Sequence, residues 1–210
     1  MSISLICSLI EVDAEHRAEF LDFHNREHIP ERVAIPGFHS GRRFVSAANP
    51  NLFLIVYEVD ALAVLTSKAY LARLNDPTEW TRRCLSFIRS SDRMAIGLGF
   101  SLGIGHGGHA CLLRGDPAAA QLSPPGDAAR LLALPGIVAV RGGWINPEAS
   151  DVDTAERQAL AAPPHERDAV MLIEAASAES LRQAIAEAAP AMKTDAAYRL
   201  QFSLTDRQAR

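Results

Sequence analysis

The chain has 210 residues, and 48% of them are hydrophobic, which is enough to bury the core of one large domain or of two small ones. Its net charge of −4 at pH 7 argues against nucleic acid as a partner, because phosphate recognition needs a basic surface. Its three cysteines are widely spaced and form no C-x-x-C pair, so we expect no disulfide framework and a cytoplasmic location.

The first half of the chain predicts elements in the order β-α-β-β-α-β, which is the ferredoxin-like pattern. Apolar runs and turn residues set their limits. In chain order we expect a buried strand at 3–12, an amphipathic helix at 14–28 that ends before Pro30, strands at 39–47 and 52–59, a helix at 61–73 that resumes at 79–90, and a strand at 93–102.

The second half predicts the same order after a glycine-rich linker at 103–108. We expect strands at 109–114, 138–145, 169–175 and 198–204, and helices at 126–134 and 180–189. An additional polar segment rich in proline and alanine, residues 146–168, is predicted to be a mobile surface loop. His106 and His109, in and beside the linker, are interpreted as incidental.

Landmark residues recur in the two halves at similar offsets, which indicates an internal duplication. The pairs are Pro36-Gly37 with Pro135-Gly136, Arg42 with Arg141, and Phe100-Ser101-Leu102 with Phe202-Ser203-Leu204. Glu58 pairs with Glu174 at a longer offset, because the additional segment 146–168 lies between them in the second half. A four-stranded sheet with helices on one face leaves its other face bare, and an apolar face must be buried. We therefore expect two sheets that pack together and enclose a cavity.

The segment from His24 to Phe38 holds the densest group of side chains that can move protons or bind anions. His24 and His28 are four residues apart on one helical face, with His28 on the last turn and His24 partly exposed. A neutral imidazole of His28 could act as acid or base, or it could interact only with the helix end. With Glu27 they spell H-x-x-E-H, a spacing that can bind a metal, although our prediction is no metal.

This segment, H-N-R-E-H-I-P-E-R-V-A-I-P-G-F, is followed by R-R-F, F-L-I-V-Y-E-V, S-K-A-Y-L and D-P-T-E-W. Together they resemble the EthD-like, uncharacterised branch of the dimeric α/β-barrel superfamily, over about residues 1–102. The resemblance implies that the histidine of the H-x-P element lies at or beside the interior pocket. Barrels of this kind include lyases, isomerases, cofactor-free monooxygenases, haem enzymes and proteins without catalytic activity.

Further candidate residues come from the strands after the motif. Alternation sends Arg42 and Arg43 to opposite faces, so Arg43 could hold a carboxylate or enolate, or form a surface salt bridge. The Tyr57 hydroxyl could donate a proton or serve only in packing. Aromatic residues predicted to line the ligand pocket are Phe44, Trp80 and Phe100. Asp127 and Ile173 replace His28 and Tyr57 in the second half, which predicts one site per chain.

The fold class we predict is α+β: two ferredoxin-like repeats, residues 1–102 and 109–210, packed sheet to sheet as one barrel. The predicted function is an enzyme for proton transfer on a small apolar carbonyl compound, without a cofactor, using His28 with His24, Arg43 and Tyr57. A ligand-binding or stress-associated barrel and a haem- or metal-dependent enzyme remain alternatives. We expect a small-molecule ligand, neither nucleic acid nor membrane as partner, and a possible homodimer.

Overall fold

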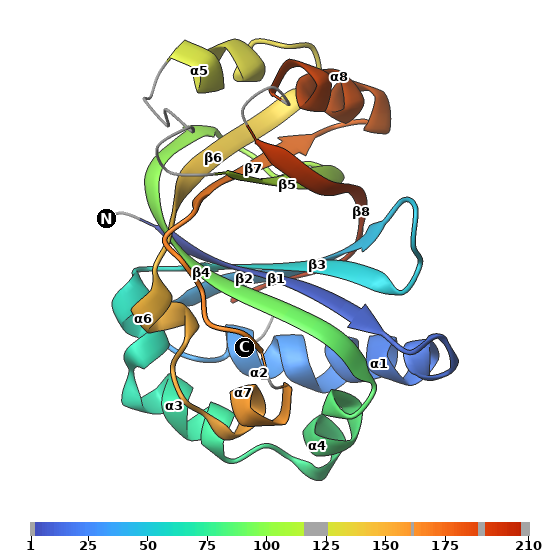
Figure 1. Cartoon of the computed structure of the whole chain (residues 1–210), viewed down its shortest axis with the longest axis vertical. Coiled ribbons are helices and arrows are strands. Elements are labelled where there is room, and N and C mark those ends of the chain that lie inside the picture. Colours follow the sequence, from blue (N-terminus) through green and yellow to red (C-terminus); the bar gives the residue numbers. More distant parts are fainter. Residues whose placement is uncertain (1–2, 116–125, 161, 189–191, 207–210) are drawn as a thin grey trace.

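The computed structural model describes residues 3–115, 126–160, 162–188 and 192–206. Ala189, the expected end of a helix, and residues 207–210 of the second predicted repeat lie outside these ranges. Within them, eight antiparallel strands close into one barrel in the order β1-β3-β2-β8-β5-β7-β6-β4 (Figure 1). This confirms the α+β class and the single barrel. The strands are β1 (Ser4–Val12), β2 (Phe38–Ser46), β3 (Leu52–Val59), β4 (Ile88–Gly103), β5 (His109–Gly115), β6 (Ile137–Ile145), β7 (Ala169–Ala175) and β8 (Lys193–Thr205).

The helices cover the outer faces of the barrel, with α1 to α4 on the N-terminal sheet and α5 and α8 on the C-terminal sheet (Figure 1). Their bounds are η1 (Ala14–His16), α1 (Arg17–Phe23), η2 (His24–His28), α2 (Ile29–Val33), η3 (Leu62–Thr66), α3 (Lys68–Asn75), α4 (Glu79–Leu85), α5 (Gly126–Leu132), α6 (Pro147–Ser150), α7 (Ala155–Leu160) and α8 (Ala178–Ala188). No helix in the described ranges is long and apolar enough to cross a membrane.

Two long strands join the sheets. Strand β4 pairs first with β1 and then, from Ile96 onward, with β6. Strand β8 pairs with β5 and then with β2. The start of β4 at Ile88 was missed, because its first residues are polar and read as the end of a helix.

The close approach of β4 and β6 requires glycine, because a Cβ atom on Gly143 would lie 2.0 Å from the Gly97 carbonyl oxygen.

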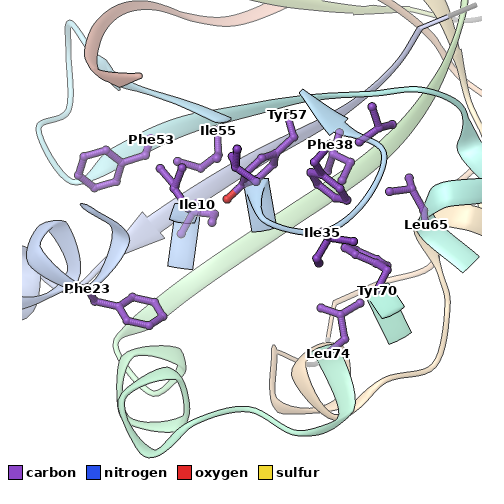
Figure 2. Packing of buried hydrophobic residues seen from close by; sticks show 14 of the residues in the cluster. Ile10, Phe23, Ile35, Phe38, Phe53, Ile55, Tyr57, Leu65, Tyr70 and Leu74 are labelled. Carbon is purple, nitrogen blue, oxygen red and sulfur yellow. The ribbon is translucent and has the colours of Figure 1, made fainter. Parts of the chain in front are cut away.

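The inward-facing side chains of both sheets form one buried hydrophobic cluster. It includes Leu5, Cys7, Phe44, Leu54, Met94, Leu112 and Leu172, each at most 1% exposed. A cavity between the sheets was expected, but these large side chains fill the space at their positions. A separate cluster lies between the N-terminal sheet and its helices, where Ile10, Ile55 and Tyr57 face Phe23 and Leu74 (Figure 2).

A buried ionic cluster joins the two halves inside the barrel. Arg42 donates hydrogen bonds to Glu174 (2.7 Å) and Glu58 (3.2 Å), and Arg141 donates to Glu174 (2.6 Å). These are the two arginine–glutamate pairs that recur in the sequence. The linker takes part as well, because the Gly107 N–H donates to Glu174 (2.9 Å) and the His106 Nδ1 lies 3.6 Å from Glu58. His106 was expected to be incidental, and this expectation is wrong, because its ring lies beside the buried cluster.

The helix that carries the histidine motif does not end at Pro30. It continues to Val33, and residues His24–His28 form a π-helical turn within it. The Ile29 N–H donates to the His24 carbonyl, five residues back, instead of four. Such a widened turn accommodates Pro30, which has no N–H to donate, without breaking the helix. His28 consequently lies in the middle of a helical segment, and the expected position on the last turn is wrong.

The described part of the segment 146–168 (residues 146–160 and 162–168), which we call the strap, is not the irregular loop that was expected. It folds into α6 and α7 and crosses to the helices of the N-terminal half, where α7 contacts α3 and α4 (Figure 1). Asn146 begins α6, with its side-chain oxygen accepting from the Ala149 N–H at 2.8 Å. A segment from the second half of the sequence thus covers the first half.

Candidate functional site

A pocket of about 100 Å³ lies between the outer face of the N-terminal sheet, its helices and the strap. Most of its lining is apolar, and Ile10, Phe20, Phe23, Leu74, Ile88 and Leu160 contribute to it. The polar lining includes His24, His28, Tyr70, Arg93 and Glu156. The pocket is therefore outside the barrel, on the side of the sheet that faces the helices.

The two motif histidines form a stacked pair in this pocket. Their ring centroids are 4.8 Å apart with an interplanar angle of 18°. The Nδ1 atoms of both rings are buried without a partner, and no hydrogen bond joins either imidazole to another described residue. His24 is only 2% exposed, so the expected partial exposure is wrong. Unpaired polar atoms in an apolar pocket indicate a place where a ligand or water supplies the missing hydrogen bonds.

The electrostatic surroundings keep both imidazoles neutral at physiological pH. Burial is the main cause that lowers the pKa of His28 well below its usual 6.5, and the charges of Arg32 and Arg73 lower it further. Burial and the charge of Arg43 likewise lower the pKa of His24. A positive field that disfavours an imidazolium also favours negative charge on a bound oxygen atom.

Arg43 and Tyr57 face the helices, but neither lines the pocket. Arg43 donates to the Asn25 side chain (2.9 Å), and burial lowers its pKa to about 10. The Tyr57 hydroxyl is buried without a partner, and burial raises its pKa. Arg42 points the other way, into the barrel, as alternation along β2 requires.

The three aromatic residues expected to line the pocket lie elsewhere. Phe44 is in the barrel interior, and Phe100 packs with the C-terminal hydrophobic cluster. Trp80 packs against Phe23 with ring centroids 5.5 Å apart, behind the pocket wall. The aromatic residues that line the pocket are instead Phe20, Phe23 and Tyr70.

A buried ion pair beside the histidines was missed by the sequence analysis. Arg32 donates to both carboxylate oxygens of Glu156, at 2.6 and 2.7 Å, and both residues are buried. Arg32 belongs to the motif and could have been singled out. Glu156 comes from the strap, 124 positions away, and no spacing in the sequence connects the two.

Arg93 adds a positive charge to the pocket wall. Its guanidinium donates to the Tyr70 hydroxyl (2.9 Å) and to the carbonyls of Ala149 and Ser150 in the strap (3.1 and 3.2 Å). These acceptors are neutral, so they satisfy its hydrogen bonds without cancelling its charge. Arg93 therefore strengthens the positive field in the pocket.

Glu27 takes no part in a site with the histidines. Its carboxylate accepts hydrogen bonds from Thr78 and, at 3.2 Å, from Thr81, and so ties the motif to the start of α4. Within the described residues, no three His, Cys, Asp or Glu side chains are grouped to hold a metal ion. The H-x-x-E-H spacing therefore does not assemble the metal site that it resembles.

Comparisons with known proteins identify the fold. No family model and no curated protein matches the chain. A crystal structure of an anthrone oxidase-like protein is similar over 100% of this chain and 96% of its own, with a TM-score of 0.67 and 11% identity. A candidate monooxygenase from Fusobacterium nucleatum is similar over 97% of this chain and 94% of its own, with a TM-score of 0.58 and 8% identity. The candidate chlorite dismutase TA0507 is similar over 96% of this chain and 96% of its own, with a TM-score of 0.53 and 12% identity. The chain thus has the fold of the dimeric α+β-barrel proteins, closed here within one polypeptide.

Proposed function

We propose that this protein is a small-molecule enzyme of EthD-like type that binds a small, largely apolar carbonyl or phenolic compound. The observation that carries the proposal is the stacked pair of neutral imidazoles, with unpaired ring nitrogens, in an apolar pocket. One N–H of such a pair can donate to the ligand oxygen. The site belongs to the first repeat of a duplicated chain, one per molecule, and among the described residues of the second repeat the strap contributes to it.

The reaction proposed is proton transfer at or next to that oxygen. His28 accepts the proton, and the charge of Arg93, whose hydrogen bonds go to neutral acceptors, stabilises the enolate or phenolate that forms. Arg32 and Arg73 contribute less, because they are paired with Glu156 and Glu31. His28, with His24 beside it, acts as acid and base from its neutral form, as an imidazole with a lowered pKa can. Arg43 and Tyr57 act at most indirectly, by supporting the helix that carries the pair. Similarity to an anthrone oxidase-like protein and a candidate monooxygenase supports a small-molecule enzyme or binding fold, and the proton transfer itself is argued from the histidine pair.

The mostly apolar lining favours a second function, a binding barrel without catalysis. A haem-dependent enzyme fits the geometry less well. The pocket of about 100 Å³ is smaller than the roughly 300–1,000 Å³ of typical organic-ligand pockets. The enzyme and the binding barrel would affect a bound weak acid differently. The positive field of the proposed enzyme site would lower the pKa of the acid, whereas an apolar pocket alone would raise it.

We expect 4-nitrophenol to bind with its pKa lowered by roughly one unit, the size of shift that a nearby opposite charge produces. The absorbance of the phenolate during a pH titration with saturating protein measures this shift. His28→Leu should weaken binding at least tenfold, since about 1.5 kcal/mol is lost with a hydrogen bond to a buried group. His39→Leu, at a surface histidine bonded to Asp60, is the matched control. A raised pKa of the bound phenol would favour the binding barrel.

A further inference from the structure

The strap forms part of the pocket wall. Ser150, Val152, Thr154, Glu156 and Leu160 all contribute to the lining. A second pocket of about 320 Å³ shares Ser91 with the first and is lined by Pro163, Pro164 and His165 near the C-terminal end of the strap. With the strap in place, the first pocket is smaller than a typical organic-ligand pocket. Displacing the strap would remove its side chains from the wall and widen the pocket.

His165, near the C-terminal end of the strap, connects the strap to β4. The Nδ1 of His165 lies 2.6 Å from the Asp151 carboxylate, and its Nε2 lies 2.7 Å from the Asp92 carboxylate of β4. A neutral imidazole has one N–H, so both contacts are hydrogen bonds only when the ring is protonated. The side chain is 4% exposed, which shields these contacts from water.

The charged groups around His165 balance one another. Arg114 of β5 contacts Asp92 (3.0 Å) and Asp168 (2.6 Å), and Arg157 of α7 contacts Asp151 (3.0 Å). With His165 protonated, three cations face three carboxylates. Loss of the imidazole proton removes one charge-assisted hydrogen bond and leaves an excess of negative charge at the point where the strap meets the barrel.

We propose that the strap is a lid over the pocket and that His165, bridging Asp92 and Asp151, is its latch. The proposal rests on the function proposed above, because a lid matters only for a pocket that takes a ligand. The two ends of the strap are connected to β6 and β7 of the C-terminal sheet. Its middle part could therefore move away from the N-terminal helices without opening the barrel. Its other attachments include the Arg32–Glu156 pair and the hydrogen bonds from Arg93 to the Ala149 and Ser150 carbonyls.

The latch is closed below a limiting pH and released above it. Hydrogen bonding to Asp92 is the main cause that raises the pKa of His165, and Asp151 raises it further. Because the folded pKa is raised, the latch is at full strength below the ordinary value of 6.5 and weakens as pH rises through the raised value. Asp92 and Asp151, whose pKa values are lowered, remain ionised through this range.

Cys84 provides a natural reporter of lid opening. It lines the pocket and is 1% exposed. Cys7 is buried inside the barrel, and Cys111 is buried in the C-terminal hydrophobic cluster. Methyl methanethiosulfonate labelling, resolved for each cysteine by peptide mass spectrometry, measures access. At pH 6.5 we expect His165→Gln to raise the Cys84 rate roughly ten- to a hundredfold over the wild type, since a charge-assisted hydrogen bond is lost. The ratio of the two rates should fall toward one at alkaline pH.

Asp151→Asn should have the same effect at Cys84, and rates at Cys7 and Cys111 should stay unchanged in both variants. Equal Cys84 rates in the wild type and both variants would overturn the latch. A parallel rise at all three cysteines would also overturn it, because it would show general unfolding instead of lid opening. No ligand is used, so this result is independent of 4-nitrophenol binding, which tests the function itself.

Discussion

Glu174→Gln is expected to destabilise the protein by roughly 3–5 kcal/mol, the usual cost of removing one partner from a buried ion pair. Glu174 is 0% exposed and accepts hydrogen bonds from Arg42, Arg141 and the Gly107 N–H. Burial raises its pKa, but the nearby His106 imidazole and the two arginines outweigh burial and lower the pKa to about 2. A neutral glutamine would leave two buried guanidiniums facing only Glu58. Urea denaturation at pH 7 measures the loss.

Glu58→Gln is the matched control, because Glu58 is the residue of the first half that corresponds to Glu174 in the second. Its side chain is 12% exposed, its hydrogen bond to Arg42 is longer (3.2 Å), and its nearest approach to Arg141 is 4.0 Å. We expect it to cost less than half as much, with water compensating part of the lost charge. Equal effects of the two substitutions would show that the cluster is not centred on Glu174.

Much of the fold could be predicted from the sequence because its signals are local. Apolar runs place six of the eight strands within one residue of their observed bounds, as for Ala169–Ala175, whereas β4 and β8 each begin five residues earlier than expected. The recurring Pro-Gly pairs mark positions where the backbone needs a positive φ, and Gly37 (93°) and Gly136 (80°) have it. The recurring Arg and Glu pairs were correctly noticed, although only the structure shows that all four meet in one cluster.

The candidate site was predicted only in part, because it depends on contacts that are distant in the sequence. The histidine pair was recognised from its spacing, but its burial results from the strap and the helices α3 and α4 packing over it. Glu156 contacts Arg32 across 124 positions, and His165 contacts Asp92 across 73. The π-helical turn was missed because proline normally ends a helix, and the bond from Ile29 to His24 has no sequence signature.

Lowering the pH from 7 to 5 is expected to destabilise the folded protein by up to roughly 4 kcal/mol through His24 and His28 alone. Both pKa values are lowered in the folded state, mainly by burial, so the unfolded chain binds protons that the folded chain does not. Stability is therefore fully present above the ordinary pKa of 6.5 and decreases as pH falls below it. For two such residues the slope approaches about 2.7 kcal/mol per pH unit. Urea denaturation at several pH values measures it.

His24→Phe and His28→Leu should each remove about half of that slope, whatever they do to stability at pH 7. Other shifted groups do not mimic the effect. The pKa of His165 is raised, so its contribution to this slope has the opposite sign. The lowered pKa values of Glu174, Asp92 and Asp151 reduce stability mainly as pH falls toward the ordinary values of 4.5 and 3.8, which lie below this window. A slope unchanged by either substitution would show that both imidazoles take up protons while folded. The pocket would then be hydrated, and the neutral pair on which the proposed function depends would not exist.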